Sequence, residues 1–66
     1  MKNNLKVLRA VANISQGDLA EKISVSRQTI NAMENGKYVP STVLALKLAS
    51  FFEKKVEEIF ELEPED

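Results

Sequence analysis

Three successive side chains near the middle of the chain carry groups that suit nucleic-acid binding: Arg27, Gln28 and Thr29. Guanidinium, amide and hydroxyl groups form hydrogen bonds to base edges and phosphate oxygens, and free backbone amides at a helix start attract phosphate. Asn31 and Ala32 fall on the same side of the expected helix. From these residues alone a plainer interpretation stays open, because most surface helices have a solvated polar face.

These side chains need a helix to hold them, and the sequence predicts one that begins at Ser26 and ends at Gly36. Serine is a favoured N-cap residue, and glycine adopts the left-handed conformation at a helix end without steric cost. Ile30 and Met33, three residues apart, should face the core. The polar residues then lie on the outer side.

A second short helix is predicted directly before this one. Ser15, followed three residues later by Asp18, has the pattern of a helix N-cap. Leu19, Ala20 and Ile23 then have the three- and four-residue spacing of a buried helix face. Two capped helices joined by a tight connection form a helix-turn-helix.

One further helix is predicted before this pair. It is capped by Asn3 or Asn4 and runs to about Ala12. Leu5, Leu8 and Ala12 form its inward-facing stripe.

The C-terminal part of the chain predicts two more helices and a short ribbon. Residues 41–52 form a helix capped by its first serine, and residues 56–60 form a shorter one. Residues 61–66 alternate charged and apolar side chains in a pattern that permits an edge strand paired with residues 1–3. The expected fold is therefore all-α, with five short helices, a central helix-turn-helix and a two-stranded β-ribbon joining the termini.

The helix over residues 41–52 is apolar on nearly every side. Its buried face is expected to hold Ala45, Leu46, Leu48, Ala49 and Phe52. Val43, Leu44 and Phe51 are then left over, and a helix of this kind should be covered on more than one side.

The segment SQGDLAEKISVSRQTINAMENGKYVPS resembles the helix-turn-helix of the lambda-repressor-like (Xre/Cro-type) transcription regulators. The resemblance extends to LKVLR before the segment, and to ALKLA and VEEIF after it. Within this family the chain is most similar to very small bacterial repressors of the cytolysin-regulator type.

The resemblance implies sequence-specific binding to double-stranded DNA as a transcription regulator, more often a repressor than an activator. The helix from Arg27 would lie in the major groove. The residues placed toward base edges are Arg27, Gln28, Asn31 and Ala32. Those placed toward the DNA backbone are Ser15, Gln16, Ser26, Thr29, Asn35, Lys37 and Tyr38.

Two of the charged or polar residues have alternative roles. Arg9 could contact a phosphate, whereas the family resemblance implies a partly buried ion pair with Glu34, for which a planar guanidinium is well suited. The hydroxyl of Tyr38 could reach a phosphate, or its ring could simply cover the core. Val39 departs from the family, in which a polar or basic residue is common at this position.

Related repressors bind two half-sites, so the chain is expected to act as a homodimer on an inverted-repeat operator. The whole of residues 1–66 would form one DNA-binding domain that ends in a dimerisation segment. The candidate interface residues are Leu44, Phe51, Val56, Ile59 and Leu62. Core packing competes for some of these residues, and for Ile59 first.

The charge of the chain is unevenly distributed. A net charge of −1 is not the basic footprint expected of a DNA-binding protein. Residues 1–40, however, carry six Lys or Arg against three Asp or Glu, a charge of +3. Residues 41–66 carry three Lys against seven Asp or Glu, a charge of −4, so the acidic half should be held away from DNA.

Composition excludes several other classes of protein. With no cysteine and no histidine, the chain lacks disulfides, the usual zinc ligands and the commonest general base, so no cofactor, metal or enzyme activity is expected. No membrane span, signal peptide or small-molecule ligand is expected, and the protein should be cytoplasmic. One rival stays open: an antitoxin-like or coregulator interaction module in which DNA binding is secondary.

Overall fold

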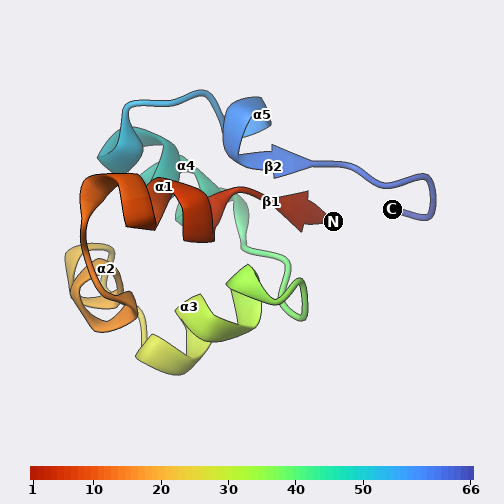
Figure 1. Cartoon of the computed structure of the whole chain (residues 1–66). Helices are drawn as coiled ribbons and strands as arrows, with labels where there is room; N and C mark the ends of the chain where they lie inside the picture. The colour runs from red at the N-terminus through yellow and green to blue at the C-terminus, as the bar shows by residue number, and fades with distance from the viewer.

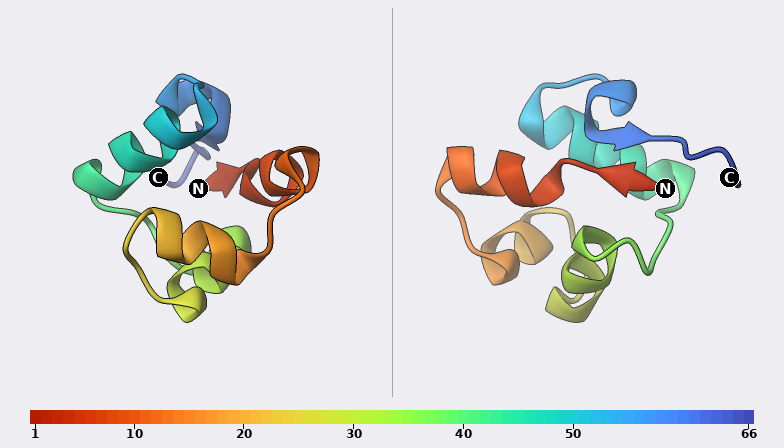
Figure 2. Two further views of the ribbon diagram at one scale, coloured as in Figure 1. Left: turned by 90° about the vertical axis from the view of Figure 1, so that its left-hand side faces the viewer. Right: turned by 45° about the vertical axis from the view of Figure 1, so that its right-hand side comes forward.

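The computed structural model describes all of residues 1–66 and contains five helices and one two-stranded antiparallel sheet (Figure 1). The elements are β1 (Lys2–Asn3), α1 (Leu5–Ala12), α2 (Gln16–Lys22), α3 (Arg27–Glu34), α4 (Thr42–Phe52), α5 (Val56–Ile59) and β2 (Phe60–Glu61). Helices α2 and α3 lie on one side of the molecule, α4 and α5 lie on the other, and α1 runs between them (Figures 1 and 2). The predicted all-α fold with a terminal ribbon is confirmed.

Serine caps begin three of the helices, as predicted. The hydroxyl oxygens of Ser15, Ser26 and Ser41 each accept the backbone N–H three residues on, at 3.0, 3.1 and 3.2 Å. At Ser15 the bond is reciprocal, because Asp18 accepts the Ser15 N–H. These local bonds satisfy backbone donors that a helix leaves free in its first turn.

Helix α3 ends at a glycine-centred turn. Gly36 has a φ of +72°, which places it in the left-handed region. Its N–H donates to Met33 O at 3.0 Å, and the N–H of Lys37 donates to Ala32 O at 2.9 Å. This pair of bonds is a Schellman motif, which satisfies carbonyls at the helix end and turns the chain sharply.

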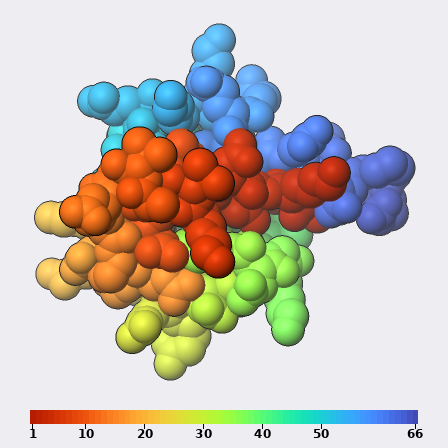
Figure 3. All heavy atoms as spheres, in the orientation of Figure 1, coloured from red at the N-terminus to blue at the C-terminus, as the bar shows by residue number.

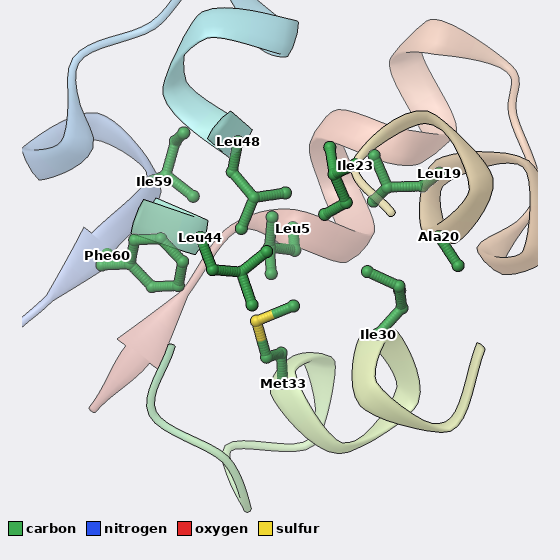
Figure 4. Close-up of a cluster of buried hydrophobic side chains, with 10 residues drawn as sticks. All are labelled: Leu5, Leu19, Ala20, Ile23, Ile30, Met33, Leu44, Leu48, Ile59 and Phe60. Atoms are coloured by element: carbon green, nitrogen blue, oxygen red, sulfur yellow. The ribbon is translucent and has the colours of Figure 1, made fainter. Parts of the chain in front are cut away.

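The core draws at least one side chain from every helix (Figure 4). Its buried members are Leu5, Leu19, Ala20, Ile23, Ile30, Met33, Leu44, Leu48, Ile59 and Phe60. The predicted inward faces of α2 and α3 are therefore correct. Burial of these apolar groups is the main force that holds the helix-turn-helix against α1, α4 and α5.

Four residues lie elsewhere than at the positions predicted for them. Leu44 is only 6% exposed and belongs to the core, whereas Leu46, predicted to be buried, is 57% exposed. A helix that is apolar all round has no periodicity from which to choose the inner face. Ile59 is also buried, so neither it nor Leu44 has surface to offer an interface. Ala12 is exposed, because it is the last residue of α1 and only the first turns of that helix, with Leu5 and Leu8, pack on the core.

The terminal ribbon pairs Lys2 with Glu61 and Asn3 with Phe60 (Figure 2). The second strand begins one residue inside the segment predicted as the fifth helix, because Phe60 adopts an extended conformation that buries its ring. No helix is long and apolar enough to cross a membrane.

Candidate nucleic-acid interface

Helix α3 has a fully buried inner face and a polar outer face. Ile30 and Met33 are completely buried, whereas Arg27, Gln28 and Asn31 are exposed. Figure 3 shows the residues of α3, coloured yellow to yellow-green, standing out at the lower edge of the molecule. The outer face is therefore accessible to a partner over the first two turns of the helix.

The exposed side chains of α3 share a shallow hollow with the start of α2. Gln16, Arg27, Gln28 and Asn31 line this hollow, and no apolar or acidic side chain does. Amide and guanidinium groups have the hydrogen-bonding capacity to read base edges or bind phosphate. The structure thus brings together one of the predicted backbone-contacting residues and three of the predicted base-reading residues. Ala32 is half-buried and lies outside this hollow.

The start of α3 combines side-chain hydroxyls with free backbone amides. The hydroxyls of Ser26 and Thr29 are 2.8 Å apart and bond to each other, and Ser26 also caps the helix. Both hydroxyls are therefore engaged within the protein. The backbone amides of Arg27 and Gln28 make no hydrogen bond, so they are the free donors at this end of the helix.

The segment after α3 adds a second group of exposed polar side chains. Asn35 donates from Nδ2 to Oδ1 of Asn31 at 3.2 Å, which ties the loop side chain to the outer face of α3. Lys37 is exposed, and Tyr38 is exposed with a hydroxyl that makes no hydrogen bond. Ser15 is exposed at the start of α2, where its hydroxyl oxygen is used by the cap.

An ion pair between Arg9 and Glu34 fixes the C-terminal end of α3 to α1. Arg9 Nε donates to Glu34 Oε2 at 2.7 Å, and Arg9 Nη2 donates to Oε1 at 3.2 Å. Arg9 Nη1 also donates to the carbonyl of Ile14 at 3.0 Å. Three of the five guanidinium N–H donors are therefore used inside the protein, which favours the structural role of Arg9 over a phosphate contact.

The environment of this pair favours both charges. The side chains of Arg9 and Glu34 are 17% and 4% exposed. Burial raises the pKa of the Glu34 carboxyl, but hydrogen bonds from Arg9 and Gln16 and the positive charge of Arg9 outweigh it and lower that pKa below its ordinary value of 4.5. The hydrogen bond to Glu34 likewise raises the pKa of Arg9. Both groups are therefore ionised at neutral pH.

Two contacts at the end of α3 were not predicted from the sequence. Gln16 Nε2 donates to Glu34 Oε1 at 3.0 Å, and Asn3 Nδ2 donates to Met33 O at 2.7 Å. Asn3 also accepts the N–H of Leu5 at the start of α1. Both contacts join residues far apart in sequence and leave no local signal. They hold the end of α3 rigidly while its first turns stay exposed.

Comparison with known proteins places this geometry in a family. A family model described as helix-turn-helix matches residues 5–59. The chain belongs to this family, in its lambda-repressor-like (Xre/Cro-type) group. The narrower resemblance to cytolysin-regulator-type repressors stays a prediction.

Relatives of nearly the same length carry the same description. An uncharacterized HTH-type transcriptional regulator of Methanocaldococcus jannaschii is 56% identical over 66 residues, which is 100% of both chains. The uncharacterized HTH-type transcriptional regulator YgzD of Bacillus subtilis is 50% identical, again over 100% of both chains. An uncharacterized HTH-type transcriptional regulator of Archaeoglobus fulgidus is 42% identical over 100% of this chain and 93% of its own.

Proposed function

We propose that the protein is a sequence-specific DNA-binding regulator of transcription that inserts α3 into the major groove. The observation that carries this proposal is the polar hollow of Gln16, Arg27, Gln28 and Asn31, presented by two helices whose other faces are locked into the core. Membership of the helix-turn-helix family and the printed names of the relatives support it. In this class of protein the second helix of the motif enters the groove and its N-terminal residues meet the bases.

Each exposed polar residue then has a role set by its chemistry. Arg27 bonds to guanine O6 and N7 or to a phosphate, and Gln28 bonds to adenine through both amide atoms or to guanine. Asn31 lies on the same face, one turn further along. Lys37 and Tyr38 contact the phosphate backbone beyond the end of α3.

The free amides of Arg27 and Gln28 supplement these contacts, because they present the positive end of the helix dipole to phosphate. Ser15 and Ser26 directly precede Gln16 and Arg27 in the chain, and Thr29 and Asn35 bond to Ser26 and Asn31. The hydrogens that these bonds leave free suit phosphate oxygens.

The protein acts as a homodimer, for which an apolar groove on the side of α4 and α5 supplies the contact surface. Val39, Leu46, Val56, Met1 and Phe60 contribute to its lining, and Val39 and Leu46 are 65% and 57% exposed. A patch of this kind satisfies itself about a two-fold axis. One recognition helix covers too few base pairs for useful affinity, so two copies on an inverted repeat are required.

The groove replaces much of the interface expected from the sequence. Of the predicted residues, only Val56 lines it. Phe51 lines a separate hollow with Lys22 and Lys47, and Leu62 is 76% exposed in the tail beyond β2. Two exposed residues that were not predicted, Val39 and Leu46, therefore become the main candidates.

The mechanism is repression by occupancy in the cytoplasm, with no chemistry performed on the DNA. A dimer bound across a promoter excludes other proteins from the same base pairs. The positive half of the chain, residues 1–40, contains the helix-turn-helix and supplies the attraction to phosphate.

Selection of bound duplexes from a random DNA pool tests the proposed function. Wild-type protein should enrich an inverted repeat whose half-sites lie about one helical turn apart. The mixed pool before selection and a scrambled duplex of the same composition provide the controls. Failure to enrich any motif over the scrambled duplex, at low as well as physiological salt, would contradict specific DNA binding.

A further inference from the structure

The amide of Gln16 has a defined orientation in the free protein. Its Nε2 lies 3.0 Å from Oε1 of Glu34, an oxygen that also accepts from Arg9 Nη2 at 3.2 Å. The amide of a glutamine has two ends, and a hydrogen-bond partner decides which way it points. Here the partner is an ionised carboxylate, which only accepts. The nitrogen of Gln16 must therefore face Glu34.

This orientation decides what Gln16 offers to the DNA-facing surface. One Nε2 hydrogen is taken by Glu34, which leaves the other hydrogen and the carbonyl Oε1. Gln16 lines the same hollow as Arg27 and Gln28, and no side-chain hydrogen bond joins it to either of them in the free protein. A carbonyl oxygen beside a guanidinium is a favourable neighbour, whereas two amide hydrogens in its place would oppose it.

We infer that Glu34 is a positioning residue for DNA reading: it fixes the amide of Gln16 so that Oε1 accepts from Arg27 and directs that guanidinium to the acceptor edge of guanine. This inference rests on the proposed function and specifies one part of it. Arg27 has five N–H donors, so it bonds to Gln16 and still presents two of them to guanine O6 and N7.

The arrangement gives the Arg9 and Glu34 pair a second role besides stability. Arg9 binds the carboxylate of Glu34, this carboxylate orients the amide of Gln16, and Gln16 in turn orients the guanidinium of Arg27. The bonds from Arg9 and Gln16 to Glu34 are present in the free protein, and Gln16 lines the same hollow as Arg27, where the inferred third bond would form. A change at Glu34 should therefore alter base preference, even though Glu34 itself is buried and cannot touch DNA.

The variant Glu34→Gln separates the two roles. The single oxygen of the new amide is expected at the place of Oε2, which accepts the shorter bond from Arg9 Nε at 2.7 Å, so its NH₂ group takes the place of Oε1 and faces Gln16. Gln16 must then flip, and it presents its own NH₂ group to Arg27 in place of the carbonyl. The matched partner variant is Gln16→Met, which has similar length and no polar end.

The test is a four-member cycle of wild type, Glu34→Gln, Gln16→Met and the double variant. The measured quantity is the dissociation constant for the selected duplex with its Arg27-dependent G·C pair replaced, divided by the dissociation constant for the selected duplex itself. That pair is identified beforehand as the one whose preference is lost in Arg27→Ala. Glu34→Gln should lower the ratio about tenfold in the wild-type background and leave it unchanged in the Gln16→Met background.

The possible results distinguish failure of the role inferred for Glu34 from failure of the proposed DNA-binding function. If Glu34→Gln lowers the ratio by the same factor in both backgrounds, or in neither, Glu34 does not act through Gln16 and the inference fails. If wild-type protein does not distinguish the selected duplex from a scrambled one, the proposed function itself fails. Circular dichroism at the binding temperature establishes that each variant is folded.

A measurement on wild-type protein covers the case in which Glu34→Gln does not fold. In an NMR titration with acid, the side-chain amide signals of Gln16 should shift with the carboxyl carbon of Glu34 and share its midpoint. Gln16 signals that stay constant while Glu34 titrates would show that the carboxylate does not hold the amide, and would overturn the inference.

Discussion

Arg9 and Glu34 lie 25 residues apart and are joined by two hydrogen bonds, from Nε to Oε2 at 2.7 Å and from Nη2 to Oε1 at 3.2 Å. The two-point geometry connects α1 directly to the last residue of the proposed recognition helix. Because the Glu34 side chain is almost completely buried, its charge depends on Arg9 as a partner inside the protein. The position of α3 therefore depends on this pair.

Glu34→Ala should lower the free energy of unfolding by about 3 kcal/mol, because Arg9 is left as a largely buried cation without its partner. Chemical denaturation followed by circular dichroism measures the loss. Glu57→Ala is the matched control, since Glu57 is exposed and makes no side-chain hydrogen bond or ion pair, and it should change stability by less than about 0.5 kcal/mol. Overlapping curves for Glu34→Ala and Glu57→Ala would contradict the structural role of the pair.

The same pair predicts a dependence of stability on pH. The pKa of Glu34 is lowered in the folded state, so the carboxylate stabilises the fold above its unfolded pKa. This contribution should be complete above about pH 5 and should disappear as the pH falls through the lower folded pKa. Denaturation midpoints of wild type and Glu34→Gln, measured from neutral to acid pH, should converge on acidification. A difference that stays constant would show that Glu34 does not titrate with a lowered pKa.

Features set by neighbouring residues could be predicted from the sequence. Ser15, Ser26 and Ser41 cap their helices through bonds that span three residues, and Gly36 stops α3 through its own backbone freedom. Each of these signals is complete within a few positions of the chain. The boundaries of the helix-turn-helix therefore followed from local chemistry.

Features set by tertiary packing could not be predicted in the same way. The choice between Leu44 and Leu46 as the buried residue of α4 is made by what packs against the helix, since both residues are apolar. The bond between Gln16 and Glu34 spans 18 residues, and the sequence alone supplies no spacing rule that would find it. The pairing of Arg9 with Glu34 was implied by family resemblance. The DNA-binding roles of the exposed residues stay predictions.

Gly36→Ala should destabilise the protein by about 1 kcal/mol, because alanine is strained at the left-handed φ of +72°. An added Cβ would lie 3.9 Å from the nearest atom, Met1 O, so no steric clash contributes to the loss. Gly17 lies within α2, where alanine is the better helix former. Gly17→Ala should therefore stabilise the protein or leave its stability unchanged. Thermal unfolding of both variants tests the sign. A stabilising Gly36→Ala would mean that α3 does not end in the Schellman motif.

Leu46→Glu should convert the proposed homodimer into a folded monomer, because a charge would face the partner's apolar groove. Leu46 is already exposed in the single chain, so its replacement should leave the fold intact. Phe51→Glu is the control, since Phe51 lies outside the groove, and it should stay dimeric.

Sedimentation equilibrium at micromolar concentration distinguishes the two states. A wild-type mass of one chain that persists at high concentration would contradict a dimer that is formed in the absence of DNA. A monomeric Phe51→Glu together with a dimeric Leu46→Glu would instead assign the interface to the hollow beside α2.

The outer face of α3 is proposed to read base sequence, and two variants test this role together. Gln28→Ala should weaken binding to the selected duplex by about 1–3 kcal/mol and relax the preference at one base pair. Lys37→Ala should weaken binding to all duplexes alike and reduce the slope of log affinity against log salt by about one. The contrast separates loss of a base contact from loss of a phosphate contact.

Fluorescence anisotropy titration of wild type and Gln28→Ala, on the selected duplex and on its single-base-pair variants, is the most direct measurement of this claim. Gln28→Ala should lose affinity for the selected duplex and lose its preference at one base pair, while it binds the scrambled duplex as wild type does. Equal affinity of the two proteins across all the duplexes would show that Gln28 does not read bases, contrary to the role proposed for the outer face of α3.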